Sequence, residues 1–275
     1  MKKISLFIGF IVLACIAHAQ EIGVQLYTFR EQFKKDVKGT IEMIHKMGIK
    51  EIEGGGTYGM DKNEYKKLLE ANSLKMVSVG ADFDQLQKDP QSIIDEAKFF
   101  GATYVMCAWI PHNGTNFTID DAKKAVDVFN TAGKLFKENG LTFCYHAHGY
   151  EFRPYEDGTL FDYMAKKMNP LYANFEMDVF WVKNPGQDPV ALLNKYPGRF
   201  KLMHLKDRKI GTTNNQNGEQ DVETNVVLGQ GDVGIADIMK VAKKLGVEHY
   251  FIEDESSHSV QQVPESLKYL KSIRM

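Results

Sequence analysis

Three side chains that could bind a metal ion stand at the ends of three short apolar segments in the second half of the chain. Asp178 ends the first segment, His204 ends the second and Glu253 ends the third. A carboxylate within an apolar strand costs several kcal/mol unless it is paired or bound to a cation. Together these ligand types suit one divalent cation such as Mn²⁺, Zn²⁺ or Co²⁺. We therefore interpret all three as metal ligands rather than as separate helix caps or salt-bridge partners.

A fourth segment, residues 141–148, ends in a His-x-His pair that offers further ligands. His146 and His148 are two residues apart, so their side chains share one face of a strand. One of them could bind the metal while the other holds substrate, and a buried, hydrogen-bonded core histidine is the alternative for either. Glu151, just beyond the strand, could act as a base on the reacting carbon. We assign His148 as a metal ligand, and Glu151, Glu253 and His146 as the candidate catalytic groups.

Four other strand-end residues could contact a substrate: Tyr27, Glu53, Trp109 and Lys206. Trp109 could form a flat apolar wall against a sugar ring, and simple core packing explains it as well. Glu53 stands at a glycine-rich turn, where it could bind sugar hydroxyls or face solvent. Lys206 follows His204 closely, so it could orient that ligand, contact substrate or form a surface salt bridge.

These residues lie in a regular alternation of strand-like and helix-like sequence. Eight strand–helix units follow one another after residue 20, without a break in composition. Such alternation indicates a parallel sheet, and eight units in roughly 250 residues are typical of a closed (β/α)₈ TIM barrel. An open doubly wound sheet is the alternative, but its glycine-rich phosphate turn is absent from the segment 28–31 after the first strand. In a barrel all strands end at one face, so the candidate residues would surround one cavity.

The residue pattern also predicts where the elements lie. A long loop rich in Asn, Gln, Gly and Thr is expected over residues 209–233. Strands are expected at 22–28, 49–53, 75–79, 103–109, 141–148, 174–178, 200–204 and 249–253. Helices are expected at 37–47, 62–71, 90–100, 120–139, 160–168, 189–195, 235–245 and 264–273.

The first residues have the pattern of an export signal. Two lysines precede an apolar run over residues 4–16, and Ala17-His18-Ala19 fits a small-x-small cleavage site. The run is too short for a typical membrane span, and the lipoprotein-like pattern at Cys15 fits less well than ordinary cleavage. We expect a signal peptide over residues 1–19, a barrel domain over residues 20–275, and a periplasmic protein if the organism is a diderm bacterium.

Charge and cysteine content exclude some classes of partner. The chain has 34 Lys and Arg residues against 36 Asp and Glu, with a formal net charge of −2, so it has no basic surplus to bind nucleic acid. Cys107 and Cys144 lie in apolar, strand-like segments, which favours buried thiols over a disulfide framework. We expect a small-molecule carbohydrate partner, no nucleic acid and no membrane span after the signal. The sequence leaves a homo-oligomer open.

In their order and spacing, the motifs resemble those of the xylose-isomerase-like TIM barrels, the sugar phosphate isomerase/epimerase family, over nearly all of the chain after the signal. The resemblance implies metal ligands at Asp178, His204 and Glu253. In the ketose epimerases of this family, the fifth and eighth strands carry a glutamate acid–base pair, and this chain has His-x-His on the fifth. The matching motifs are Tyr145-His146-Ala147-His148 with Glu151-Phe152, Glu176-Met177-Asp178 with Trp181, Met203-His204-Leu205-Lys206-Asp207, and Ile252-Glu253-Asp254-Glu255.

The resemblance implies a metal-dependent sugar isomerase or epimerase. It would abstract a proton next to a carbonyl and form an enediolate stabilised by one divalent metal ion. The altered fifth strand and the export signal favour an alternative, a 3-keto-glycoside lyase, in which the same enediolate expels the C1 substituent by β-elimination. A non-catalytic carbohydrate-binding barrel is the third interpretation, because a fold alone does not establish activity.

Overall fold

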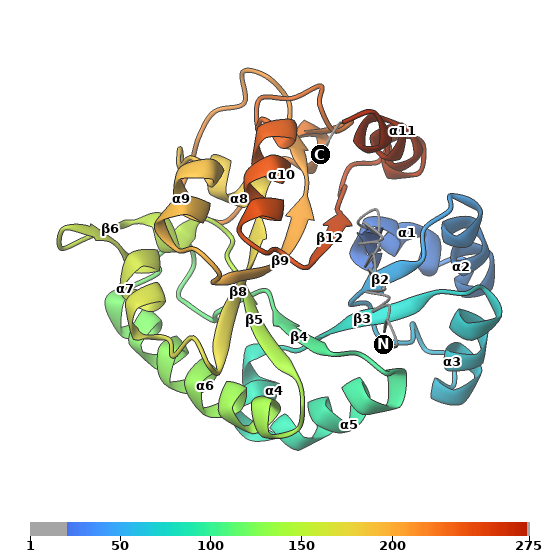
Figure 1. The fold of residues 1–275 in the computed structure, drawn as a ribbon, viewed down its shortest axis with the longest axis horizontal. Helices are drawn as coiled ribbons and strands as arrows, with labels where there is room; N and C mark the ends of the chain where they lie inside the picture. The colour runs from blue at the N-terminus through green and yellow to red at the C-terminus, as the bar shows by residue number, and fades with distance from the viewer. Residues whose placement is uncertain (1–20, 274–275) are drawn as a thin grey trace, which may run out of the picture.

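Eight short strands run parallel to one another and close into a barrel (Figure 1). The computed structural model describes residues 21–273, and the expected signal peptide over residues 1–19 lies outside them. The strand order around the barrel is β1-β12-β9-β8-β5-β4-β3-β2, with β2 paired to β1. The (β/α)₈ barrel expected from the sequence is therefore confirmed. Its strands are β1 (Ile22–Gln25), β2 (Glu51–Glu53), β3 (Lys75–Gly80), β4 (Tyr104–Cys107), β5 (Thr142–His146), β8 (Ala173–Asp178), β9 (Phe200–Leu205) and β12 (His249–Ile252).

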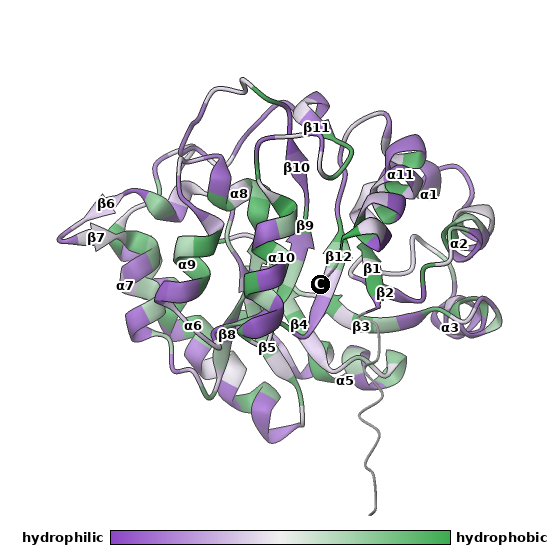
Figure 2. Ribbon diagram, turned by 45° about the horizontal axis from the view of Figure 1, so that its top comes forward, coloured by the Kyte–Doolittle hydropathy of each residue, from purple (hydrophilic) through white to green (hydrophobic). Residues whose placement is uncertain are grey.

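Helices connect the strands and cover the outside of the barrel (Figure 1). They are amphipathic, and the hydrophobic and hydrophilic residues of α10 (Ile235–Lys244) alternate along the helix in Figure 2. No helix among the described residues is long and apolar enough to cross a membrane. The other helices are α1 (Arg30–Phe33), α2 (Val37–Lys46), α3 (Lys62–Ala71), α4 (Phe83–Lys88), α5 (Pro90–Phe100), α6 (Ile119–Glu138), α7 (Leu160–Lys167), α8 (Val179–Lys183), α9 (Pro189–Lys195) and α11 (Ser259–Ser272).

The long helices begin and end within one residue of the bounds expected from the sequence, except for α11. That helix begins at Ser259 rather than at Pro264, so the proline lies inside the helix and does not start it. The first strand ends at Gln25 rather than at Thr28, where a 3₁₀ turn begins. The minor elements are β6 (Pro154–Tyr155), β7 (Gly158–Thr159), β10 (Asp207–Arg208), β11 (Asn225–Val226), and the 3₁₀ turns η1 (Leu26–Phe29), η2 (Tyr150–Phe152) and η3 (Val222–Thr224).

Side chains that point into the barrel form an apolar layer below a polar one. The apolar layer is a cluster of five buried residues: Val77, Tyr104, Cys144, Leu202 and Phe251. Two residues further along β5, β9 and β12, the inward positions are polar: His146, His204 and Glu253. The apolar layer closes the cavity from below, so the polar groups are open to solvent only from the C-terminal face.

The connection over residues 209–233 rises above β9 and is drawn largely as hydrophilic in Figure 2. Within it, β11 pairs with β10, which lies just before the connection. The buried carboxylate of Asp207 also accepts hydrogen bonds from the backbone N–H groups of Gly229, Gly231 and Val233, at 2.8, 3.0 and 3.2 Å. The loop therefore returns to the end of the strand from which it started, and it stands over the barrel mouth.

Candidate metal centre

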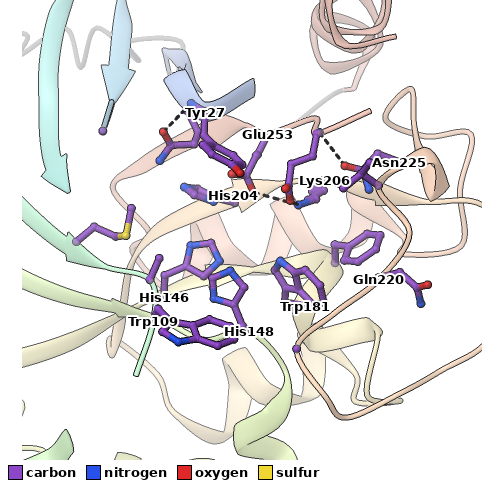
Figure 3. A pocket seen from close by; sticks show the side chains of 18 of the residues that line it. Tyr27, Trp109, His146, His148, Trp181, His204, Lys206, Gln220, Asn225 and Glu253 are labelled. Carbon is purple, nitrogen blue, oxygen red and sulfur yellow. Dashed lines mark hydrogen bonds and ion pairs between the residues drawn. The ribbon is translucent and has the colours of Figure 1, made fainter. Parts of the chain in front are cut away.

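Three side chains bring possible metal-binding atoms together at the C-terminal end of the barrel. His146 ends β5, Asp178 ends β8 and His204 lies near the end of β9. Asp178 Oδ2 is 3.7 Å from His146 Nε2 and 4.0 Å from His204 Nδ1. One atom of each residue lies within 4.8 Å of the other two, so one ion could contact all three. Figure 3 shows both histidines in the same pocket.

Asp178 is held in place by the helix that it precedes. Its Oδ1 accepts hydrogen bonds from the backbone N–H groups of Phe180, at 2.8 Å, and Trp181, at 3.2 Å, in the first turn of α8. This is the usual role of an aspartate N-cap. The other oxygen, Oδ2, has no hydrogen-bond partner among the described residues. The cap therefore fixes the carboxylate and leaves one oxygen for an ion.

A second layer of carboxylates stands behind the two histidines. Glu176 Oε2 is 3.4 Å from His146 Nδ1, and Glu176 Oε1 is 3.3 Å from His204 Nε2. Glu53 Oε1 lies 2.6 Å from the same His204 nitrogen. In metal sites, carboxylates behind a histidine fix the orientation of the ring and raise its basicity. The ring nitrogens that face away from Asp178 therefore have acidic neighbours, and the nitrogens that face Asp178 are left for an ion.

An ion pair lies on the other side of His204. Lys206 Nζ is 3.2 Å from Glu253 Oε2 and also donates to Glu255. Glu253 Oε2 is 3.5 Å from His204 Nδ1. Burial alone would lower the pKa of Lys206, but Glu253 and Glu255 raise it, so the lysine is an ammonium group. Burial alone would raise the pKa of Glu253, but Lys206 and His204 hold it well below its usual range, so this side chain is a carboxylate.

The two acids on β8 hold protons more tightly than ordinary carboxyl groups do. Burial raises the pKa of Asp178 to about 7. Burial, reinforced by the neighbouring Glu53 carboxylate, raises the pKa of Glu176 well above its usual range. Both shifts follow from burial, which disfavours negative charge at this site.

His146 and His204 have pKa values shifted in opposite directions. Burial and the neighbouring His148 hold the pKa of His146 well below its usual range, so its ring is neutral and carries a lone pair that a metal can use. Burial alone would lower the pKa of His204, but the carboxylates of Glu176 and Glu253 raise it well above its usual range. A bound cation would compete with the proton on His204.

The donor set fits a divalent cation. Several buried atoms have no hydrogen-bond partner among the described residues, and an unpaired buried polar group costs ~1–3 kcal/mol. An ion with two charges would satisfy several of these atoms at once and balance the surplus of carboxylates. The unpaired atoms include both ring nitrogens of His146, both carboxylate oxygens of Glu176, Asp178 Oδ2 and His204 Nδ1.

His148 lies beside the three-residue group rather than within it. Its ring stacks on His146 with a centroid distance of 4.5 Å, and it also approaches Trp181, at 5.3 Å. Burial lowers the pKa of His148 to about 4, so this ring is neutral as well. The sequence-based assignment made His148 the ligand and His146 an acid–base group. The structure instead brings His146 next to Asp178.

Glu151, which we expected to act as a base on the reacting carbon, lies behind β5 and does not line the pocket. Its Oε1 accepts hydrogen bonds from the Tyr145 hydroxyl and from the backbone N–H of His148, the latter at 3.2 Å. Gly149 turns the chain with a φ of +96°, and a Cβ there would lie 3.0 Å from the carbonyl oxygen of Trp181. The turn carries Glu151 to the outer side of the strand, away from the residues that line the cavity.

A cavity of about 570 Å³ opens above the group. Tyr27, Trp109 and Lys206 line it, as expected from the sequence, whereas Glu53 is fully buried beneath it. The sequence interpretation gave no role to Glu176. The spacing could have indicated such a role. Residues two apart on a strand share a face, so Glu176 must point into the barrel beside Asp178.

Comparisons with known proteins agree with this fold. The sequence model of the xylose isomerase-like TIM barrel family matches residues 40–273. Among curated relatives, the chain is 24% identical over 180 residues to an inosose dehydratase from Clostridium beijerinckii. That match covers 58% of this chain and 59% of the relative's own length. The chain belongs to the xylose isomerase-like TIM barrel family.

Solved structures show the same barrel. A sugar phosphate isomerase/epimerase from Parabacteroides distasonis superposes with a TM-score of 0.77 and 24% sequence identity, covering 94% of this chain and 97% of that one. A structure described as the IOLI protein with a binding zinc atom has a TM-score of 0.72 and 12% identity, covering 92% of this chain and 98% of that one. At these identities the likeness concerns the fold alone.

Proposed function

We propose that this protein is a divalent-metal-dependent lyase. It removes the proton next to the ketone of a sugar-like ring and expels the substituent on the following carbon. The observation that carries the proposal is the buried group of His146, Asp178 and His204, whose facing atoms have no hydrogen-bond partners among the described residues. The ionised carboxylate of Glu253 lies beside this group. The dehydratase name of a curated relative, which describes a loss of water, supports the same reaction class.

His146 Nε2, Asp178 Oδ2 and His204 Nδ1 would hold the ion, with Glu176 and Glu53 supporting the two histidines from behind. The similar barrel described with a bound zinc atom supports a divalent metal as the ion. When bound, a divalent cation supplies Lewis-acid polarisation of a carbonyl oxygen. We assign the ligand role on β5 to His146 in place of His148, because its Nε2 is the atom that faces Asp178.

Glu253 is the group that moves the proton. It is ionised and can accept the proton from the carbon next to the ketone. The electrons of that carbon–hydrogen bond form a carbon–carbon double bond as the carbon–oxygen bond on the next carbon breaks. The proton then passes from Glu253 to the departing oxygen. The products are an unsaturated ketone and an alcohol, or water when the leaving group is a hydroxyl.

Elimination fits this site better than epimerisation does. Epimerisation by two bases requires a second acid–base group, free of the metal, on the opposite face of the sugar. The end of β5 carries the neutral ring of His146, and Glu151 is turned away behind the strand. One base suffices for an elimination, since it can return its own proton to the leaving group. The isomerase or epimerase interpretation stays a prediction and is one outcome of the following experiment.

The test is a reaction in deuterium oxide followed by NMR. The protein is stripped with a chelator, reloaded with Mn²⁺, Zn²⁺ or Co²⁺, and given phenyl 3-keto-β-D-glucopyranoside or a free ketose. We expect metal-dependent release of phenol and a new vinyl proton signal. Deuterium entering C2 of the keto-glucoside, or a free ketose, without release would overturn the lyase in favour of an isomerase or epimerase, and no exchange into either substrate would overturn both.

Two variants complete this experiment. Glu253→Gln should abolish release of phenol, because the amide cannot accept the proton. Glu265→Gln is the control, because Glu265 is exposed on α11, where its carboxylate forms an ion pair of 2.6 Å with Lys268. Equal loss of activity in both variants would contradict the role of Glu253.

A further inference from the structure

A row of aromatic rings continues from the candidate ligands toward the pocket mouth. His148 stacks on His146, and its ring centroid is 5.3 Å from that of Trp181 and 5.7 Å from that of Trp109. Figure 3 draws Trp109, His148 and Trp181 along one side of the pocket, with Tyr27 on the other side. The pocket therefore has an aromatic region next to the metal-binding region and distinct from it.

Trp109 is exposed but firmly held. The residue is 43% exposed, although its ring packs against Tyr150 and His112, with centroid distances of 5.0 and 4.9 Å. The Tyr150 hydroxyl accepts a hydrogen bond of 3.0 Å from the backbone N–H of Ile110, the residue after Trp109. A large aromatic surface fixed in place at a pocket mouth is ready to receive a flat apolar partner without losing further conformational entropy.

The cavity has the volume for more than the reacting group. Its 570 Å³ falls within the roughly 300–1,000 Å³ of pockets that hold drug-sized ligands. The candidate ligands occupy its floor. Tyr27, which is 51% exposed, faces the cavity from the turn after β1, with the Arg30 guanidinium 4.6 Å above its ring. A ring bound at the metal region would leave the aromatic region unfilled.

The charges that line the cavity disfavour an anion. Lys206 is the one lysine or arginine among the described residues of the lining, and it is already paired with Glu253 and Glu255. Glu219 and Asp221, from the loop over the barrel mouth, also line the cavity. Outside the candidate metal site, no free cationic side chain of this lining is left for a phosphate or carboxylate, and Glu219 and Asp221 would repel one.

We propose that Trp109, His148 and Trp181 form a subsite for a second, uncharged ring that is joined to the reacting sugar. The inference rests on the proposed function and deepens it by naming the leaving group. The substrate class is a neutral glycoside whose aglycone or second sugar lies against the aromatic row, rather than a sugar phosphate or a lone monosaccharide. His148, whose ring touches both regions, lies where the bond between the two rings would be.

The test measures binding of glycosides that cannot react. The chain contains two tryptophans, and both belong to the proposed subsite, so intrinsic tryptophan fluorescence reports on its occupation. Phenyl β-D-glucopyranoside, cellobiose, glucose and glucose 6-phosphate are titrated into the metal-loaded protein, with calorimetry as a second readout. We expect at least one ring-bearing glycoside to bind about tenfold more tightly than glucose, through aromatic contact. Glucose 6-phosphate should bind no better than glucose.

Preference for the phenyl glucoside would identify an aryl aglycone, and preference for cellobiose a second sugar. Trp109→Ala should remove the preference and leave the affinity for glucose unchanged, while Trp109→Phe should keep most of it. Tyr155→Ala is the control, because Tyr155 lies in the β6–β7 hairpin and does not line the cavity. Equal binding of all four compounds, equal weakening of every compound by Trp109→Ala, or tighter binding of glucose 6-phosphate would each overturn the subsite.

These results are separable from the proposed function. The glycosides carry no ketone, so their binding does not depend on proton abstraction. Selective binding without turnover of any keto-sugar would retain the subsite and contradict the lyase. Elimination from a small free keto-polyol as fast as from a keto-glycoside, with no difference in binding, would retain the lyase and contradict the subsite.

Discussion

The inner face of β8 and the outer side of β5 each bury a glutamate, and the two are instructive to compare. Glu176 is 1% exposed and Glu151 is fully buried. Burial raises the pKa of both, to about 7 for Glu151 and well above the usual range for Glu176. Glu176 stands between two histidine rings inside the barrel, whereas Oε1 of Glu151 accepts hydrogen bonds from the Tyr145 hydroxyl and the backbone N–H of His148 outside it.

The difference is that, within the described part of the chain, neither carboxylate oxygen of Glu176 has a hydrogen-bond partner, whereas only Oε2 of Glu151 lacks one. Both carboxylate oxygens of Glu176 are without a hydrogen bond among the described residues, whereas Glu151 Oε1 has two donors. Burial and a raised pKa alone would mark either residue as catalytic. The side of the strand on which each carboxylate lies distinguishes them. Glu176, inside the barrel, has a role at the cavity, and Glu151, outside it, has a structural role. The following variants test this difference.

The largest effect on metal binding is expected from Asp178→Asn. Asparagine can still cap α8 but cannot supply an anionic ligand, so metal affinity should fall by more than the roughly 10–100-fold that outer-shell changes cost. Asp188→Asn is a matched control, since Asp188 caps α9 with the same pattern, accepting from Val190 N at 2.8 Å and Ala191 N at 3.2 Å. Metal content measured by mass spectrometry checks this, and unchanged content in Asp178→Asn would contradict the site.

A smaller effect is expected from Glu176→Gln. The amide keeps the size of the side chain but loses the charge behind His146 and His204, so metal affinity should fall roughly 10–100-fold. Competition with a fluorescent chelator measures it. An affinity equal to that of the wild type would remove Glu176 from the support of the two histidines.

No effect on metal affinity is expected from Glu151→Gln, but this variant should change how stability depends on pH. Glu151 holds its proton more tightly in the folded protein, so its pKa rises from an ordinary 4.5 to about 7. The folded state then binds more protons than the unfolded state between these values, and stability falls as pH rises through that window. The loss integrates to about 3 kcal/mol in the wild type and is absent in the variant.

Urea unfolding of both proteins at pH 4.5 and pH 8 provides the measurement. The free energy of unfolding of the variant should improve relative to the wild type at the higher pH. A difference between the two proteins that stays constant with pH would show that Glu151 does not carry this proton.

The barrel and the bounds of most long helices could be predicted from the sequence because the apolar segments and helix caps recur at regular spacing. The short helices α1, α4 and α8 could not, since four to six residues carry too little periodicity. The side of β5 on which Glu151 lies depends on the positive φ of Gly149, and a strand pattern in the sequence does not predict that backbone angle. The export signal and the periplasmic location stay predictions.

The choice between His146 and His148 needed the structure for a related reason. Both share a face, as their spacing predicts, but β5 ends at His146 and the chain then leaves the barrel. His148 is carried toward Trp181, away from Asp178. Spacing of two residues gives the face of a strand, but it does not tell where the strand ends.

The raised pKa values of the acids on β8 have a calorimetric consequence. At neutral pH, Asp178 and Glu176 hold protons for part or all of the time, and His204 holds one as well. An ion that binds these residues must expel protons into the solvent. The heat of metal binding will therefore change with the ionisation enthalpy of the buffer, and comparing two buffers at one pH would count the protons released.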